Sequence, residues 1–274
     1  MDDLLEIAGA LLPQVRLDAA FLATDGNIHD VLLIPGVAAV RVSRRPSAAE
    51  AMPRRVAALR LIAAAGLPFQ VPEPLTPVTM FGDRAAVAVS WINGVAMPEG
   101  EGDPAKVAEV LDALRAVPLT AELAATLDDR PGGRHWSEIL GEDILPRLPA
   151  RWQSEAQRRL DAALALDPVP DALVHGDIGG SNVHWSADGK LIGVLDWDLA
   201  MPFDPAVDAA LMAWHGWDNV RRAVSSDTYH RARTWDALFG VGHLVATLNG
   251  RPMTNPDGFV RAISPWLEQH ASHA

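Results

Sequence analysis

Residues 173–198 read LVHGDIGGSNVHWSADGKLIGVLDWD, and the order of apolar, glycine and acidic positions in this stretch decides the fold class. The stretch leaves an apolar segment, turns at a glycine and reaches Asp177 at the start of an irregular loop. Asn182 follows five positions later. This pattern predicts a short strand followed by a loop that presents polar side chains.

The second half of the stretch predicts a β-hairpin. Residues 183–185 and 191–195 are two short apolar runs, and Asp188-Gly189 between them is a strong turn pair. The second strand ends at Asp196. The hairpin therefore returns Asp196 to the neighbourhood of Asn182 and of the preceding loop.

The spacing of these polar residues is typical of protein-kinase-type phosphoryl transfer. There, one aspartate orients the acceptor hydroxyl and receives its proton, while an asparagine and a later aspartate hold magnesium on the nucleotide phosphates. Carboxylate and amide oxygens suit Mg²⁺ better than zinc or copper. The alternative is that no metal binds and backbone donors satisfy the acids.

The segments before this stretch predict a small antiparallel β lobe. Short apolar runs broken by DGN and PG predict consecutive strands over residues 21–42, and two further strands complete a five-stranded sheet. Residues 47–66 predict helix, with Ser47 and Glu50 as a capping box. Because proline cannot sit deep in a helix, we expect a new helix to begin at Pro53.

A glycine-, proline- and acid-rich segment near residue 93 is the best linker candidate, and the chain beyond it is mostly helical. We therefore expect an α+β protein with a protein-kinase-like two-lobe fold. Residues 1–92 form a nucleotide-binding β lobe, and residues 93–274 form a larger α-helical lobe that carries the catalytic β-hairpin. One predicted helix begins at Pro104, and further helices are predicted over residues 121–127, 136–145, 151–166, 205–214, 227–248 and 256–270.

Composition narrows the classes of partner. The 274 residues include 23 basic and 35 acidic side chains, a net charge of −12, which disfavours nucleic acid and anionic membranes and favours cationic small molecules or metal ions. The chain has no cysteine, which excludes disulfides, thiolate nucleophiles and cysteine-ligated metals. With no secretory signal pattern and no long apolar run, we expect a cytoplasmic protein, either a monomer or a weak homodimer.

The motifs HGDIGGSN, VLDWD and FDPAVDAA resemble the signature of the aminoglycoside phosphotransferase superfamily. That superfamily has a protein-kinase-like fold and phosphorylates hydroxyls of small molecules. Within it, the arrangement is most similar to the viomycin and capreomycin phosphotransferase branch, as are GNIHDV, EAMPRR and AGLPFQVPEPL. The resemblance covers roughly residues 20–248 and is specific around 173–208.

The resemblance implies a role for each matching residue. Asp177 would be the catalytic base or hydroxyl orienter, and Asn182 and Asp196 would be magnesium ligands. Asp198 would approach metal or substrate, or would equally be a solvated surface charge. Structural roles near the site, bracing the loop and tying the helix after Pro205 to it, are implied for His175, Asp204 and Asp208.

The chain departs from the kinase pattern at the phosphate clamp. Such kinases use a strand lysine paired with a helix glutamate, but the only lysines here are Lys106 and Lys190. Arg41 stands where the strand lysine is expected, with Arg44 three residues on. Arginine can replace the charge of lysine but not its shape. The alternative is that RVSRRP is a surface basic cluster.

The partner of Arg41 and the contacts of the nucleotide base complete the expected cofactor site. Arg55 occupies the position of the helix acid, so we expect Glu50 to take the partner role. The turn in TDGNIHDV would cover the phosphates through backbone N–H groups, or is an ordinary hairpin turn. By position and resemblance, the base of ATP or GTP would bind backbone at Ser90, Trp91 and Ile92.

The acceptor is expected over the helical lobe. Acidic residues there favour a cationic, hydroxyl-bearing acceptor such as an aminoglycoside or a tuberactinomycin-type peptide, although each acid alone could be a solvated charge. The aromatic residues of AWHGWD could line the site or belong to the core. The candidate acids are Glu138, Glu142, Asp143, Asp198 and Asp218.

Several functions remain open from sequence alone. The first is a small-molecule O-phosphotransferase with an antibiotic acceptor, ATP or GTP as donor and Mg²⁺. The second is a kinase of a metabolite such as choline or homoserine. The third is a nucleotide-binding module without catalytic activity, which the missing lysine favours. A metal hydrolase built on His175, Asp177 and His184 is weaker, because no further ligand is evident.

Overall fold

The computed structural model describes residues 1–23, 28–127 and 133–270. The chain forms two compact units. The first comprises residues 1–96, 120–127 and 181–198, and the second comprises residues 97–119, 128–180 and 199–274. None of the helices in the described ranges is long and apolar enough to span a bilayer.

In the first unit, the described residues form a five-stranded antiparallel sheet in the order β1-β2-β3-β5-β4. The predicted N-terminal antiparallel sheet is therefore confirmed. Its strands are β1 (Phe21–Leu22), β2 (His29–Ile34), β3 (Ala38–Ser43), β4 (Thr79–Phe81) and β5 (Arg84–Ser90).

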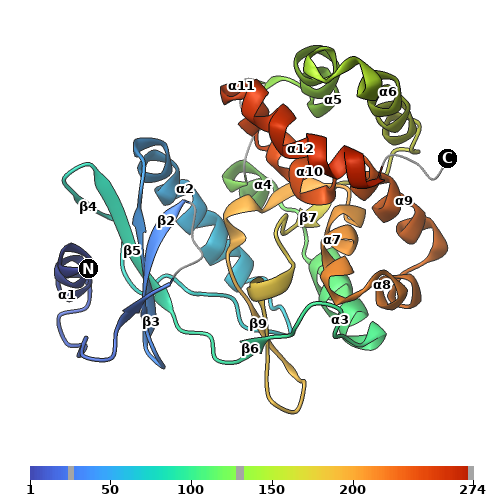
Figure 1. Ribbon diagram of the computed structural model, residues 1–274. Coiled ribbons are helices and arrows are strands. Elements are labelled where there is room, and N and C mark those ends of the chain that lie inside the picture. Colours follow the sequence, from blue (N-terminus) through green and yellow to red (C-terminus); the bar gives the residue numbers. More distant parts are fainter. Residues whose placement is uncertain (24–27, 128–132, 271–274) are drawn as a thin grey trace. The chain divides into compact units, whose positions relative to one another are not determined.

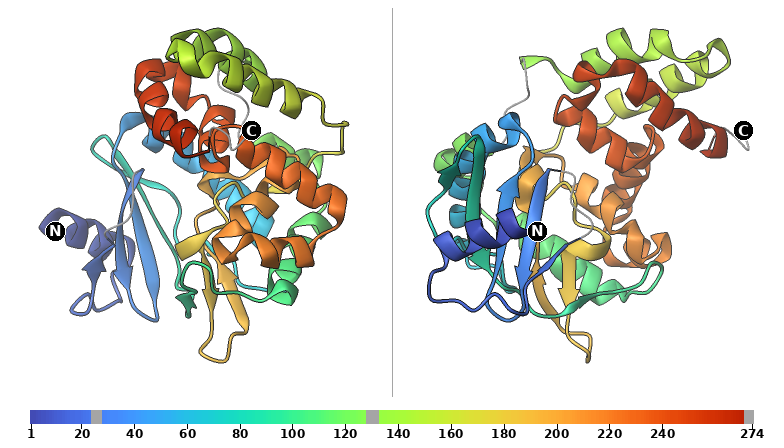
Figure 2. Two further views of the ribbon diagram at one scale, coloured as in Figure 1. Left: turned by 45° about the vertical axis from the view of Figure 1, so that its right-hand side comes forward. Right: turned by 60° about the vertical axis from the view of Figure 1, so that its left-hand side comes forward.

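Helices cover both faces of this sheet. On one face, α1 (Asp2–Leu11) packs Leu4 and Ile7 against strand residues that include Val40 and Val42. On the other face, α2 (Pro46–Ala63) packs against β3 and β5. Figure 1 shows α1 and α2 on opposite sides of the strands, and Figure 2 shows the dark-blue α1 beside the sheet from two further directions. Helix α1 was not predicted from the sequence.

The predicted start of a helix at Pro53 is wrong, because α2 runs unbroken from Pro46 to Ala63. Pro46 takes the first helical position, where no N–H is needed, and the N-cap residue Arg45 makes no side-chain capping hydrogen bond. The expected capping box of Ser47 is therefore also wrong. An internal proline costs a helix about 3 kcal/mol, and the buried face of α2, which includes Met52 and Val56, offsets this cost.

The predicted hairpin is present as β8 (Val183–Trp185) and β9 (Leu191–Val194). A further strand, β6 (Val95–Ala96), adds to β8. The hairpin belongs to the first compact unit, where the Gln70 N–H donates to the Ile192 carbonyl at 2.8 Å and the Val194 N–H donates to the Gln70 carbonyl at 2.9 Å. The short helix α4 (Ala121–Thr126) also lies in this unit.

The second unit is mostly helical, as predicted. Its two short strands β7 (Ala172–Val174) and β10 (Met201–Phe203) pair in an antiparallel manner, and β10 was not predicted. A π-helical turn at Ile139–Ile144 and a 3₁₀ turn at Leu145–Arg147 continue α5. The helices are α3 (Pro104–Ala116), α5 (Trp136–Glu138), α6 (Ala150–Leu164), α7 (Ala206–Leu211), α8 (Trp217–Ala223), α9 (Ser226–Ala237), α10 (Val241–Leu248), α11 (Arg251–Thr254) and α12 (Pro256–His270).

The single helix predicted over 227–248 is wrong. It is divided into α9 and α10, because Phe239 and Gly240 both adopt left-handed backbone conformations, with φ of 81° and 90°. Gly240 is also packed closely, since a Cβ there would lie 2.8 Å from the Trp266 Nε1. The helical periodicity on both sides of the break conceals it in the sequence.

Candidate active site

The loop after β7 carries Asp177, and its backbone is held by its neighbours. His175 is fully buried, and its Nδ1 accepts a hydrogen bond from the Asp177 N–H at 3.1 Å. Gly176 has φ of 80°, and a Cβ at that position would lie 2.6 Å from the Leu199 carbonyl oxygen. Glycine is therefore required immediately before the half-buried Asp177.

Asp208, in the first turn of α7, is the anchor of this loop. Its carboxylate accepts from the His175 N–H at 2.7 Å and from the Gly176 N–H at 3.0 Å. Burial raises the pKa of Asp208 to about 7; the two backbone donors oppose the rise and the nearby Asp177 charge adds to it.

Asp204 stabilises the start of the same helix. Its carboxylate accepts from the Ala206 N–H at 2.9 Å, from the Arg231 Nε at 3.0 Å and from the Trp235 Nε1 at 2.7 Å. Asp204 is buried, so these donors compensate its charge.

Asn182 and Asp196 lie at the open end of the hairpin, where the Leu195 N–H donates to the Asn182 carbonyl at 2.8 Å. Asp196 has φ of 53°, a left-handed conformation that aspartate tolerates better than most residues. The Asp196 side chain is 49% exposed. The backbone of Asn182 is thus paired with Leu195, the residue before Asp196, and the chain turns at Asp196.

This donor set fits Mg²⁺, which commonly binds one or two protein carboxylates together with substrate phosphates. Within the described ranges, no group of three or more histidine, aspartate or glutamate side chains could hold a metal by itself. A magnesium ion at Asn182 and Asp196 would therefore depend on the phosphate oxygens of a nucleotide for further ligands.

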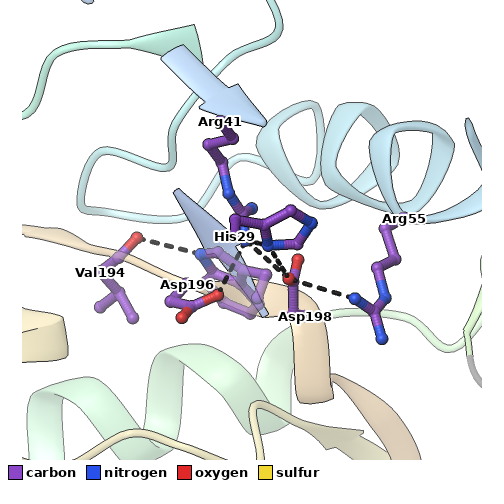
Figure 3. Close-up of polar contacts among 7 residues, drawn as sticks. His29, Arg41, Arg55, Val194, Asp196 and Asp198 are labelled. Atoms are coloured by element: carbon purple, nitrogen blue, oxygen red, sulfur yellow. Dashed lines mark hydrogen bonds and ion pairs between the residues drawn. The ribbon is translucent and has the colours of Figure 1, made fainter. Parts of the chain in front are cut away.

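Arg41 faces the hairpin from β3. Val40 and Val42 point into the core under α1, so the alternation of the strand places Arg41 on the α2 face. Its NH2 donates to Asp198 Oδ2 at 2.6 Å and to Asp196 Oδ1 at 3.2 Å. Figure 3 shows these contacts together.

Two more basic side chains surround Asp198. Arg55, from α2, donates through NH1 to Asp198 Oδ2 at 3.3 Å, and His29 Nδ1 lies 3.3 Å from the same oxygen. His29 Nδ1 also contacts the Arg41 NH2 at 3.2 Å. His29 and Arg55 were not among the candidate site residues from sequence, although Arg55 was identified at the helix position.

The charged groups in this cluster shift the pKa values of Asp198 and His29. Burial raises the pKa of Asp198, but Arg41, His29 and Arg55 outweigh it and hold that pKa below its usual value. Burial, together with the charge of Arg41, lowers the pKa of His29 to about 4. At neutral pH the cluster therefore combines a carboxylate, two guanidinium groups and a neutral imidazole.

Comparison with known proteins identifies the class of this chain. The sequence profile of the phosphotransferase enzyme family matches residues 22–240. The chain belongs to this family. It is also 30% identical to the viomycin phosphotransferase of Streptomyces vinaceus, in an alignment of 218 residues that covers 73% of this chain and 75% of the relative.

Solved structures give the same answer for the fold. The GDP complex of aminoglycoside 2'-phosphotransferase-IIIa matches with a TM-score of 0.78 at 16% identity, covering 97% of each chain. The macrolide 2'-phosphotransferase MphH from Brachybacterium faecium matches with a TM-score of 0.67 at 19% identity, covering 97% of this chain and 99% of that one. The predicted kinase-like α+β fold and the predicted phosphotransferase class are therefore confirmed.

The remaining residues expected in the nucleotide site of this phosphotransferase are arranged differently from the expectation. Glu50 is exposed on α2 and makes no contact with Arg41, whose partners in the described ranges are His29, Asp196 and Asp198. Arg44 donates through Nε to Asp30 at 2.7 Å. The acidic partner of Arg41 is thus on the hairpin rather than on the helix.

The residues expected near the nucleotide base are the last residue of β5 and the two that follow it. The Ser90 Oγ accepts from the Glu73 N–H at 2.9 Å, the Trp91 Nε1 donates to Asn93 Oδ1 at 2.7 Å, and Ile92 is buried. Their contact with a base stays a prediction. Gly26, in the turn expected over the phosphates, lies outside the described residues.

All of the acids expected at the acceptor site except Glu138 already have basic side chains as partners. Arg134 donates to Glu142 Oε2 at 2.7 Å and to Asp143 Oδ2 at 2.6 Å. Glu138 accepts from the His135 N–H as part of a capping box. Asp218 is exposed and lies 3.3 Å from Arg221. The net negative charge that these acids offer an acceptor is therefore smaller than their number suggests.

Proposed function

We propose that this chain transfers the γ-phosphoryl group of ATP or GTP to a hydroxyl of a small cationic antibiotic of the tuberactinomycin type, the class that includes viomycin. The observation that carries the proposal is the 30% identity to a viomycin phosphotransferase over 73% of this chain. A net charge of −12 supports a cationic acceptor. The structural neighbours act on aminoglycosides and macrolides according to their names, which supports an antibiotic acceptor more broadly.

In the proposed reaction, Asp177 is the group that orients the acceptor. Its carboxylate accepts a hydrogen bond from the attacking hydroxyl and takes the proton as the oxygen bonds to the γ-phosphorus. The bond from that phosphorus to the β,γ-bridging oxygen breaks, and the nucleoside diphosphate leaves with the bonding electrons. The anchoring of His175 and Gly176 by Asp208 supports this role, because it limits the movement of the loop.

Charge on the phosphates is balanced by basic groups. Arg41 is the proposed phosphate ligand of the β lobe, in place of the usual lysine. When bound, Mg²⁺ would neutralise phosphate charge, and Asn182 and Asp196 would hold it. The backbone at Ser90, Trp91 and Ile92 would contact the base. Neighbouring structures contain GDP or ADP, which supports a purine nucleotide as donor.

The organisation that accompanies this function is also proposed. Residues 1–92 would bind the nucleotide, and residues 93–274 would contribute the catalytic loop and the acceptor site. Glu142, Asp143 and Asp218 are the acids proposed to attract the acceptor or a metal. The protein would act in the cytoplasm as a monomer or weak homodimer.

The test is an acceptor screen that measures nucleoside diphosphate release with ATP and with GTP in the presence of Mg²⁺. The panel contains viomycin, kanamycin, a macrolide and the hydroxylated metabolites choline and homoserine. The proposal expects release that depends on viomycin or another cationic antibiotic. Release with one of these metabolites and with no antibiotic would assign a metabolite kinase, and nucleotide binding without any release would assign an inactive nucleotide-binding module.

A further inference from the structure

We infer that Asp198, the second acid of the DWD motif, is a positioning residue that holds Arg41 for the nucleotide phosphates. It would take over the role that a helix glutamate plays in the usual lysine–glutamate pair. The inference rests on the proposed function, since it concerns how the nucleotide is bound. It assigns to Asp198 neither metal binding nor acceptor binding.

The carboxylate that pairs with Arg41 is on the hairpin, and the helix carries a basic residue instead. The α2 position at which the usual kinase has a glutamate is occupied by Arg55. This arginine donates a hydrogen bond to Asp198. Glu50 is exposed, without contact to Arg41. The strand and the helix are therefore both basic at this point, and the hairpin supplies the carboxylate that compensates them.

The two acids of the DWD motif differ in their exposure to solvent. The Asp198 side chain is 6% exposed, whereas that of Asp196 is 49% exposed. A divalent cation at Asp198 would lie beside two guanidinium groups that already share its Oδ2, and repulsion between these charges disfavours such binding. Asp196 has room for a metal, and Asp198 is enclosed by basic side chains.

Two of the three guanidinium nitrogens of Arg41 make no hydrogen bond within the described ranges. All its hydrogen bonds within the described ranges are made through NH2, to His29, Asp196 and Asp198. Its Nε and NH1 donors remain available to phosphate oxygens, to which charged donors make strong hydrogen bonds. Asp198 thus holds the NH2 of the guanidinium group, and no protein group in the described ranges occupies the other two nitrogens.

The experiment measures binding of ADP and GDP by calorimetry, once with Mg²⁺ and once with EDTA. A positioning residue affects nucleotide affinity in both conditions, because arginine contacts phosphate with or without the metal. A metal ligand affects it only when Mg²⁺ is present. We expect Asp198→Asn to weaken binding at least tenfold, by a similar factor in both conditions. Asp198→Glu, which keeps the charge, should recover part of the loss.

A relocated charge gives the second arm. In the double variant Asp198→Asn with Arg55→Glu, the acid returns to the helix beside Arg41, and we expect affinity closer to the wild type than that of Asp198→Asn alone. The matched control is Glu155→Gln in α6, since Glu155 is a largely buried carboxylate held by Arg158 and Arg159. It should lower thermal stability and leave the nucleotide affinity unchanged.

A third arm covers the case in which Asp198→Asn does not fold. The Arg41→Gln variant removes one of the charges that would be left unpaired, and Asp198→Asn is added to it. The single variant Arg41→Gln and the double variant Arg41→Gln with Asp198→Asn should have nucleotide affinities equal within about twofold, because Asp198 would act through Arg41.

Wild-type affinity in Asp198→Asn, a loss confined to Mg²⁺, or a tenfold further loss in the Arg41→Gln background would overturn the inference and leave the proposed function standing. A wild-type protein that binds neither nucleotide would overturn both.

Discussion

Asp208 accepts a hydrogen bond from the backbone N–H of His175 at 2.7 Å, and this bond ties the first turn of α7 to the loop that carries Asp177. The loop is also held by the second bond from the Gly176 N–H. Two N–H groups of one tight turn therefore converge on a single buried carboxylate. This arrangement limits the positions that the Asp177 side chain can take.

The role of Asp177 predicts a specific kinetic change. Asp177→Asn keeps the size of the side chain but cannot take the hydroxyl proton, so we expect the transfer rate to fall by about 10² to 10⁴-fold. Nucleotide affinity and melting temperature should change little. The exposed Asp171, which precedes β7, gives the matched control as Asp171→Asn. An unchanged rate in Asp177→Asn would exclude this residue as the base.

The raised pKa of Asp208 predicts a dependence of stability on pH. The folded protein holds the Asp208 proton up to a pKa of about 7, whereas the unfolded chain releases it near 3.8. Stability from this group is therefore present at pH 4 and declines as pH rises to 7, by about 4 kcal/mol at most. Urea unfolding of wild type and Asp208→Asn should show that the wild-type advantage shrinks over this range. A constant difference would contradict the buried, protonated carboxyl.

His29 predicts the opposite trend over an overlapping range. Its pKa is about 4 in the folded protein and 6.5 when the side chain is fully solvated, so the unfolded chain takes up the proton first as pH falls. Stability from His29 is therefore present at pH 7 and lost between pH 6.5 and 4, by about 3 kcal/mol at most. His29→Gln should remove this loss. The same unfolding series measures it, and a wild-type advantage that grows toward pH 4 would refute it.

Gly176 predicts a steric effect on the loop. A methyl group there would meet the Leu199 carbonyl oxygen at 2.6 Å in a left-handed backbone conformation, so Gly176→Ala should destabilise the protein by more than about 2 kcal/mol and reduce activity. Gly82 shares a positive φ, 64°, but nothing lies within 4 Å of its Cβ position. Gly82→Ala should therefore cost only about 1 kcal/mol. Equal costs in the two variants would show that the close contact at Gly176 has no effect.

Much of the fold could be predicted because its signals are local. Alternating apolar positions and the Asp188-Gly189 turn pair define the hairpin, and similar signals define the strands of the sheet. Pro53 and Phe239 show where local rules fail. The packing of α2 overrides the cost of its proline, and a phenylalanine with φ of 81° at the end of α9 has no signature in the sequence.

The candidate site divides in the same way. Asp177, Asn182 and Asp196 follow from the spacing of one continuous stretch. The partner of Arg41 could not be predicted, because Asp198 lies 157 positions away in the chain and pairing across that distance depends on tertiary structure. His29 was missed for the same reason, since a single histidine in a strand carries no local sign of its partners.

The most direct test of the central claim is mass spectrometry of viomycin after incubation with the protein, Mg²⁺ and either ATP or GTP, beside the same incubation with Asp177→Asn. We expect the wild type to add one phosphoryl group to a hydroxyl of the antibiotic and the variant to add almost none over the same period. Unmodified viomycin in the presence of a wild-type protein that is folded and bound to nucleotide would contradict it.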